Sequence, residues 1–304
     1  MDPRIVMVRR TTEYESLLAE HGTPQMAKFH LEQKGLKLDQ VLLSHYKVLD
    51  ASEAVLGAVP TTWRKAWVLR EDIDRFRFDP SDVIMAVGWD GLVPNVAKYL
   101  TGQPVFGINP FGVSQKMMLW EPHRAKIIYH VILPSLGSYL QARTMAMATL
   151  EDGRSLVAMN EIFCGHRSHQ SAKYDITHEG KTEYHSSSGF IVTTGTGLTG
   201  WALSLANAMK VDLKDYDLDP TDQRLLFLVR EAWTGPGTGT SIQHGDVDVD
   251  SPLTAVSKIQ DGGILFGDGI ESDSLEFNWG TKVTFAPAPQ PLMLATPKKS
   301  THEL

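Results

Sequence analysis

One strand-turn-helix pattern constrains the fold of this chain more than any other part of its sequence. Residues 82–87 (DVIMAV) form a continuous apolar run of strand length, which ends in the glycine turn GWDG at 88–91 before a helix-like stretch around 95–100. Residues 105–109 (VFGIN) are a second strand candidate at the spacing of a βαβ crossover. The pattern predicts a parallel α/β sheet with the glycine turn at the carboxyl edge of its strands.

The rest of the sequence divides into three regions. Residues 1–125 combine apolar strand patterns with capped helices, including a capping box at Thr12 and Glu15, and predict an α/β domain. Residues 126–285 are rich in short strand patterns, beginning with one at Ile127–Leu133, and predict antiparallel sheets interrupted by one helix. Residues 286–304 hold three prolines within six residues and predict an extended, partly disordered tail.

Composition excludes several classes of function. Among 304 residues there are 29 Lys and Arg against 36 Asp and Glu, a net charge of −7, so the chain lacks the basic excess that holds nucleic acid or anionic lipid. Cys164 is the only cysteine, which excludes an intramolecular disulfide and a four-thiolate zinc site. Without a signal-peptide pattern or an apolar stretch of about 18 residues, the sequence predicts a cytoplasmic protein with no membrane partner.

The turn at 88–91 is the first candidate site. Glycines at the end of a strand allow main-chain N–H groups to approach a phosphate, and the start of the following helix favours negative charge. Asp90 in such a turn can accept a proton from a hydroxyl that attacks the phosphate, or organise magnesium. An ordinary tight turn is the competing interpretation, because Asp and Gly are common there.

Two further polar segments follow predicted strands in the second half. The loop TGTGLTG at 194–200 is dense in amides and hydroxyls and can hold a pyrophosphate, although it matches neither GxGxxG nor a Walker A loop. A sharp strand-to-helix connection explains it equally well. Asn160 and Glu161 follow the apolar segment SLVAM and can hold ribose hydroxyls, but two solvated polar residues at a strand end are the simpler interpretation.

One cysteine and four histidines close together in the sequence form a candidate zinc site. Its members have separations seen in zinc sites, but the run lacks a second paired motif, so a hairpin bearing solvated histidines is favoured. The residues are Cys164, His166, His169, His178 and His185.

Taken together and in this order, these segments resemble the NAD kinase family. DVIMAVGWDG is similar to the family's strand and GGDG loop, VFGIN to its strand ending Gly-Ile/Val-Asn, and NEIF to its Asn-Glu motif. SSGFIVTTGTGLTGW, LFLVREAW at 226–233 and ILFGDG at 264–269 are closest to the branch that includes the mitochondrial NAD kinase of animals. The resemblance covers residues 80–285.

The resemblance implies a fold, a reaction and a set of site residues. The fold is an α/β Rossmann-like amino-terminal domain and a β-sandwich-like carboxy-terminal domain, with the active site between them. The reaction is transfer of the γ-phosphoryl group of ATP to the 2′-hydroxyl of the adenosine ribose of NAD, with Mg²⁺ required and no metal ligand among the protein's own residues. Homodimers or homotetramers are implied by resemblance only. The implied roles are catalysis by Asp90, phosphate binding by Gly88, Trp89 and Gly91, and substrate binding by Asn160, Glu161, Ser188, Thr194, Gly195, Thr196, Gly197 and Thr199.

Trp89 is the main departure from the family pattern. It occupies the second glycine of the loop, where glycine permits close approach or a positive φ, and Leu92 stands where a threonine is usual. Three outcomes follow: the indole stacks on a base in an active kinase, it alters the donor or acceptor, or the chain binds a dinucleotide without turnover. A kinase for another hydroxyl (nucleoside, sugar or lipid head group) is a further alternative, because diacylglycerol and sphingosine kinases share the loop. The retained Asp90 favours an active NAD kinase.

Overall fold

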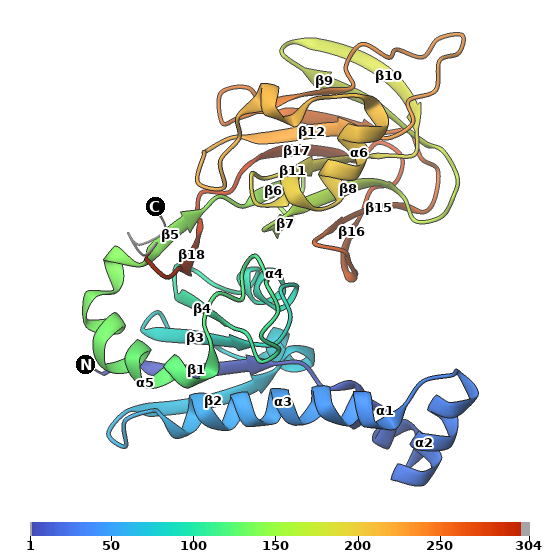
Figure 1. Ribbon diagram of the computed structural model, residues 1–304. Coiled ribbons are helices and arrows are strands. Elements are labelled where there is room, and N and C mark those ends of the chain that lie inside the picture. Colours follow the sequence, from blue (N-terminus) through green and yellow to red (C-terminus); the bar gives the residue numbers. More distant parts are fainter. Residues whose placement is uncertain (1, 299–304) are drawn as a thin grey trace. The chain divides into compact units, whose positions relative to one another are not determined.

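The computed structural model describes residues 2–298 of the chain, which divide into two compact units. Unit 1 comprises the chain up to Gln141 together with the segment from Met293, and unit 2 comprises Ala142–Leu292. Figure 1 shows the helices and strands of each unit. Unit 1 carries a parallel α/β sheet and unit 2 carries antiparallel sheets, so the predicted fold class is confirmed.

Unit 1 is built on a six-stranded sheet with the order β2-β1-β3-β4-β18-β5. Strand β1 pairs in parallel with β2 and β3, and β3 pairs in parallel with β4, as the crossover pattern predicts. Every residue of β3 is buried, which explains why its sequence is a continuous apolar run. The strands are β1 (Arg4–Arg9), β2 (Arg64–Leu69), β3 (Asp82–Val87), β4 (Pro104–Ile108), β5 (Leu140–Arg143) and β18 (Leu292–Ala295).

A partly buried ion pair joins the first residues of β1 and β3. Arg4 and Asp82 are register partners, and Arg4 Nε and Nη2 donate to the two Asp82 carboxylate oxygens at 2.7 and 2.6 Å. The hydrogen bond to Asp82 raises the pKa of Arg4, against the effect of burial. Both hydrogen bonds can form only when Arg4 lies opposite Asp82, so the ion pair specifies the register between β1 and β3.

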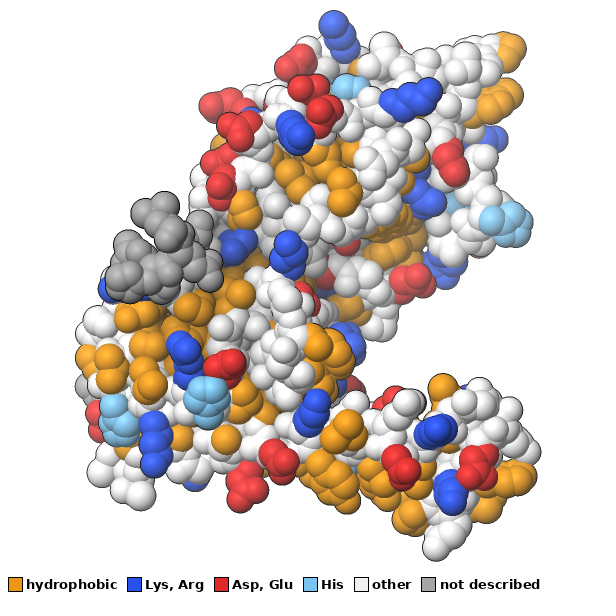
Figure 2. All heavy atoms as spheres, viewed as in Figure 1, with side chains coloured by type: hydrophobic (Ala, Val, Ile, Leu, Met, Phe, Trp, Pro, Cys, Tyr) orange, Lys and Arg blue, Asp and Glu red, His pale blue; other side chains and the backbone are white. Residues whose placement is uncertain are grey.

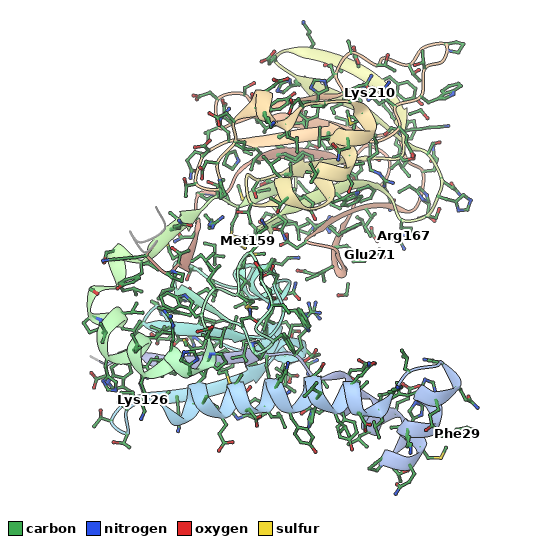
Figure 3. The ribbon with its side chains drawn as sticks, viewed as in Figure 1. Phe29, Lys126, Met159, Arg167, Lys210 and Glu271 are labelled. Atoms are coloured by element: carbon green, nitrogen blue, oxygen red, sulfur yellow. The ribbon has the colours of Figure 1, made fainter. Side chains whose placement is uncertain are left out.

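Helices cover the sheet and extend beyond it. Helix α1 begins at the predicted capping box, in which the Thr12 hydroxyl accepts from the Glu15 N–H and the Glu15 side chain accepts from the Thr12 N–H. Helix α3 packs Ala51 and Val55 against the sheet (Figure 1). Figure 2 shows hydrophobic side chains on the surface of α1 and α2, where Figure 3 labels Phe29. The helices are α1 (Glu13–His21), α2 (Pro24–Gln33), α3 (Leu38–Gly57) and α4 (Leu92–Ala97).

The segment predicted as a strand at Ile127–Leu133 is helical, and that prediction is wrong. It forms α5 (Ala125–Ile127), a π-helical turn at Ile128–Ile132 and a 3₁₀ turn at Leu133–Ser138. Residues 125, 128, 129 and 132 are buried in the unit 1 core while 127 and 131 are exposed, which is helical spacing. Because this segment packs on the α/β sheet, the units divide after Gln141 rather than at residue 125.

Unit 2 is a sandwich of two six-stranded antiparallel sheets. Their orders are β10-β9-β14-β17-β6-β7 and β13-β12-β11-β8-β15-β16. Alternate residues of β11 explain the layers: Phe190 and Val192 face the core between the sheets, whereas Ile191 packs under Ala202 and Ala206 of α6 (Trp201–Met209) on the outer face. The strands are β6 (Ala146–Leu150), β7 (Ser155–Ala158), β8 (Glu161–His166), β9 (Ala172–His178), β10 (Lys181–Ser187), β11 (Phe190–Thr193), β12 (Leu225–Val229), β13 (His244–Val247), β14 (Leu253–Ser257), β15 (Gly263–Gly267), β16 (Ile270–Glu276) and β17 (Lys282–Pro287).

The carboxy-terminal segment returns to unit 1. Strand β18 pairs in parallel with β4, and Trp120 Nε1 donates to Ala295 O at 2.9 Å. The tail expected at 286–304 therefore contains a sheet strand, and its residues 299–304 lie outside the described part of the chain. No helix among residues 2–298 has the length and apolarity needed to cross a membrane.

Candidate functional site

The glycine turn after β3 has one conformationally essential glycine. Gly88 has a φ of +153°, which L-amino acids rarely adopt, and Gly91 has an ordinary helical φ of −63°. Trp89 is not among the described residues with a positive φ. Its indole is 57% exposed and stacks on Phe111, with ring centroids 4.0 Å apart. The backbone of this turn therefore accommodates a tryptophan where the family pattern has glycine.

Asp90 is held by backbone amides of the segment after β4. Its Oδ1 accepts from the N–H groups of Met117 and Met118 at 2.9 and 3.1 Å, and its Oδ2 accepts from the N–H of Lys116 at 2.8 Å. The Asp90 N–H donates to Gln115 Oε1 at 2.8 Å. The carboxylate thus has a fixed orientation, and three of its roughly four acceptor positions are filled.

The two motifs of unit 1 are connected through Gln115. Its Nε2 donates to Oδ1 of Asn109, the residue that follows β4, at 2.9 Å, while its Oε1 accepts from Asp90. The predicted strand ends VFGIN and DVIMAVGWDG are therefore parts of one hydrogen-bonded cluster at the carboxyl edge of the sheet.

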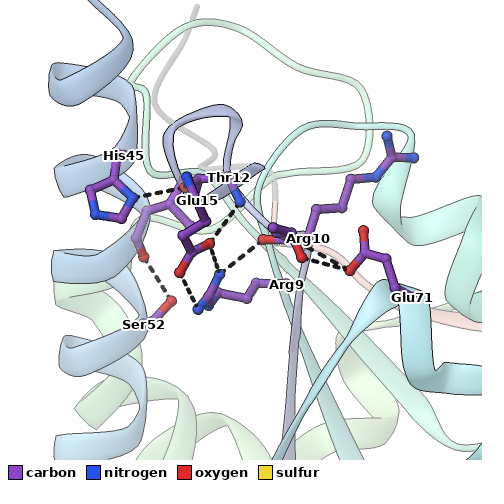
Figure 4. A network of polar contacts seen from close by, with 9 residues as sticks. Arg9, Arg10, Thr12, Glu15, His45, Ser52 and Glu71 are labelled. Atoms are coloured by element: carbon purple, nitrogen blue, oxygen red, sulfur yellow. Dashed lines mark hydrogen bonds and ion pairs between the residues drawn. The ribbon is translucent and has the colours of Figure 1, made fainter. Parts of the chain in front are cut away.

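A cavity of about 300 Å³ lies beside the turn. It is lined by Gly88, Trp89 and Phe111 on one side and by Arg10 and His45 on another. His45 Nδ1 and Thr12 Oγ1 share a hydrogen bond of 2.7 Å, which ties α3 to the capping box of α1 (Figure 4). The cavity combines aromatic, imidazole and guanidinium groups at the strand ends.

The second cluster lies in unit 2 and joins two segments that the sequence predicts separately. Thr194 N–H donates to Asn160 O at 2.9 Å, and Thr194 Oγ1 donates to Met159 O at 2.6 Å (Figure 3 labels Met159). Thr194 Oγ1 also accepts from the N–H groups of Thr196 and Gly197 at 3.1 and 3.3 Å. The threonine-glycine loop is therefore folded onto the main chain of Met159 and Asn160, immediately before Glu161.

Close packing explains two of the three glycines of this loop, Gly195 and Gly197. A Cβ on Gly197 would lie 2.3 Å from Thr193 Oγ1 and 2.4 Å from Asn160 O, and one on Gly195 would lie 2.3 Å from Asp219 O. These separations are shorter than any real contact, so each position requires a hydrogen in place of a side chain.

Asp268 completes the unit 2 cluster, and it was not predicted as a site residue. Its Oδ1 and Oδ2 accept from the N–H groups of Asn160 and Met159 at 2.7 and 3.0 Å, and its own N–H donates to Glu161 O at 3.0 Å. The Asp-Gly pair in ILFGDG marks a turn after β15, where Asp268 has a φ of 54°. The sequence carries no signal for its partner 108 positions away.

Glu161 has a perturbed acidity. Burial, followed by the negative charge of Asp268, raises its pKa from 4.5 to about 7. Its carboxyl group therefore exchanges between acceptor and donor forms near neutral pH, which suits contacts with sugar hydroxyls.

This shift makes stability depend on pH. Between pH 4.5 and 7 the folded chain keeps a proton that the unfolded chain has released, so the stabilisation is present at low pH and is lost as pH rises through 7. The melting temperature of the wild type, measured relative to Glu161→Gln, should fall across this window. A constant difference between the two proteins would contradict the raised pKa.

The other predicted substrate residues, Thr196, Thr199 and Ser188, lie in three different environments. Thr196 Oγ1 is buried and, among the described residues, has no hydrogen-bond partner, whereas Thr199 is exposed at the end of the loop. Ser188 is engaged elsewhere, because its hydroxyl donates to Glu231 and its N–H donates to Arg230 O. Hydrogen bonds thus join the loop to Met159 and Asn160, whereas Ser188 is bonded to Arg230 and Glu231.

The cysteine-histidine run does not assemble a metal site in the part of the chain that the structure describes. Cys164 is fully buried, and burial raises the pKa of its thiol. The β9–β10 hairpin is present, but His185 is 1% exposed and hydrogen-bonds to Glu183, so the prediction of a solvated histidine is wrong there. The side chain packs inward against Tyr174.

Comparisons with known proteins identify the fold. No family model and no curated protein matches the chain. Among solved structures, it is similar to an NAD kinase from Archaeoglobus fulgidus in complex with ATP, with a TM-score of 0.59 and 16% identity over 97% of this chain and 94% of that chain. It is also similar to yeast NADH kinase complexed with NADH, with a TM-score of 0.62 and 13% identity over 98% and 84%. The chain therefore has the fold of NAD kinases over nearly its whole length.

Proposed function

We propose that this protein is an NAD kinase that transfers the γ-phosphoryl group of ATP to the 2′-hydroxyl of the adenosine ribose of NAD, giving NADP. The observation that carries the proposal is the unit 2 cluster, in which Thr194 of the loop at 194–197 is bound to the main-chain oxygens of Met159 and Asn160, next to Glu161. This cluster occurs in a chain with the fold of an NAD kinase solved with ATP and an NADH kinase solved with NADH.

In the proposed reaction, the 2′-hydroxyl oxygen forms a bond to the γ-phosphorus while the bond to the bridging β,γ-oxygen breaks, and ADP leaves. Asp90 accepts the hydroxyl proton, and its three amide contacts orient the carboxylate for that role. The N–H groups at Trp89 and Gly91 face the phosphates. The Gly88 N–H donates to Ile108 O at 3.2 Å, so Gly88 contributes the side-chain-free backbone of the turn, which lets the phosphates approach. Asn160 and Glu161 hold the acceptor dinucleotide, and Thr194, Gly195, Thr196, Gly197 and Thr199 form the loop beside it, with Ser188 as a further substrate contact.

Magnesium enters this scheme bound to the ATP phosphates, whose charge it neutralises. Asp90 has both oxygens in use, and the described residues offer no group of three His, Cys, Asp or Glu side chains that could hold the ion on their own. In this proposal the ion is held by the nucleotide phosphates. A homodimer or homotetramer is part of the proposal, and light scattering of the purified protein tests it.

The direct test is NADP formation. Purified protein incubated with ATP, Mg²⁺ and NAD should produce NADP, measured with an NADP-specific dehydrogenase. NADH and polyphosphate, each tested in place of NAD and ATP, establish the acceptor and donor preference. A nucleoside, sugar and lipid panel tests the other hydroxyl acceptors. Failure to form NADP with either donor would overturn the proposal.

A second candidate function is NAD binding without phosphoryl transfer. It is favoured by Trp89 in the phosphate turn and by the engagement of both Asp90 oxygens. It predicts that NAD raises the melting temperature while no phosphate moves. Trp89→Gly separates the two functions: turnover that appears only in the variant means the indole blocked the donor, and turnover that the variant loses means the indole belongs to a working site.

A further inference from the structure

Two arginines converge at the carboxyl edge of the unit 1 sheet. Arg9 is the register partner of both Leu69 on β2 and Val87 on β3, so the next residues of the three strands, Arg10, Arg70 and Gly88, leave the sheet side by side. Arg10 Nη2 and Arg70 Nε both donate to Asn95 Oδ1, at 2.7 and 2.9 Å. Asn95 is a residue of α4 and is only 4% exposed.

The shared acceptor, Asn95 Oδ1, belongs to an uncharged side chain, so it does not neutralise the positive charges of Arg10 and Arg70. Burial, followed by the positive charge of Arg70, lowers the pKa of Arg10. Glu71 acts in the opposite direction and offsets part of this positive charge, and its Oε2 accepts from the N–H and hydroxyl of Thr11 at 3.4 and 3.2 Å (Figure 4). Two guanidinium groups that share one amide oxygen keep most of their N–H donors for another acceptor.

Of the two arginines, Arg10 lies directly beside the glycine turn. The nearest atom to a Cβ built on Gly91 is Arg10 Nη2, at 3.9 Å, so no side chain separates the guanidinium from this exposed glycine. Arg10 also lines the cavity of about 300 Å³, together with Gly88 and Trp89. Planar guanidinium groups match phosphate oxygens in bidentate geometry.

We infer that Arg10 and Arg70 bind the phosphate chain of a nucleoside triphosphate beside the turn at 88–91. The ligand class is a linear polyphosphate anion, whose several negative charges match two adjacent cations. Its assignment as the donor of the reaction rests on the proposed NAD kinase function. The anion site itself rests on the convergence of the two arginines.

Titration calorimetry with inorganic tripolyphosphate tests the site without requiring turnover. Arg10→Gln and Arg70→Gln should each raise the dissociation constant about 10- to 100-fold. Arg10→Lys should recover part of the loss, because it keeps the charge without the planar fork. Arg75→Gln is the matched control: its side chain is 84% exposed at the other end of the 3₁₀ helix Arg70–Arg75, and the variant should bind like the wild type. Circular dichroism confirms that each variant is folded.

Steady-state kinetics distinguish this inference from the proposed function. The two glutamine variants should raise KM for ATP and leave KM for NAD within about twofold. Wild-type binding of tripolyphosphate by both glutamine variants would overturn the inference even if NADP is formed. If the wild type forms no NADP but its tripolyphosphate binding depends on both arginines, the anion site stands and the NAD kinase proposal fails.

Discussion

Replacing Asp90 by asparagine is expected to lower the rate of NADP formation by about 100- to 10,000-fold, the contribution of a positioned general base. The substitution keeps the shape of the side chain but removes its ability to take the hydroxyl proton. It also turns an NH₂ group toward one of the N–H donors of residues 116–118. A modest fall in unfolding free energy, about 1–3 kcal/mol, should therefore accompany the loss of activity.

Gln115→Ala is the control that separates catalysis from loop positioning. It removes the bonds to the Asp90 N–H and to Asn109 while leaving the carboxylate in place. If Asp90 is the base, this variant should lower the melting temperature by a similar amount but retain activity within about tenfold of the wild type. Equal losses of activity in both variants would show that Asp90 serves only to hold the loop.

Replacing Gly197 by alanine is expected to disrupt the unit 2 cluster. The added methyl group would overlap Asn160 O and Thr193 Oγ1, so the backbone at Asn160 must move. Such overpacking costs about 1–3 kcal/mol of unfolding free energy, measurable as a lower urea midpoint. Because the moved residue is a proposed NAD contact, the dissociation constant for NAD should rise at least about tenfold.

Gly200→Ala is the matched control in the same loop. Its Cβ would lie 3.5 Å from Gly197 O, which is ordinary van der Waals contact. The Gly200 backbone (φ −109°, ψ −125°) lies outside the regions that alanine prefers, so this variant should also lower the urea midpoint. Because its methyl group does not overlap Asn160, it should keep the affinity for NAD near the wild-type value. Wild-type NAD affinity in a folded Gly197→Ala protein would contradict the assignment of this loop to the acceptor site.

Local sequence patterns predicted most of the helices and strands that hold the polar clusters of units 1 and 2. The capping box at Thr12, the buried run of β3 and the strand before residue 194 depend on neighbouring residues, and the structure confirms all three. The helical turns at 125–138 were missed because a continuous apolar run has no alternation to distinguish a buried strand from a helix. That error also displaced the expected boundary between the units.

The sequence could not predict which polar residues from distant segments of the chain come into contact. The sequence singled out Asp90, Asn160 and the loop at 194–199. Local patterns gave the last two as separate segments, and only the resemblance to NAD kinases implied that they bind the same substrate. Asp268 and the pair Arg10 and Arg70 were not assigned, because a lone Asp-Gly turn and arginines at strand ends are common surface features.

The sequence by itself determined the fold class, the glycine turn at the strand edge and the order of the polar motifs, because apolar periodicity, caps and turns act over a few residues. The tertiary structure alone decided which polar groups meet. Strand register brings Arg10, Arg70 and Gly88 together, and close packing at Gly197 binds residue 160 to the loop. Register and packing arise from the whole folded chain, which no local pattern encodes.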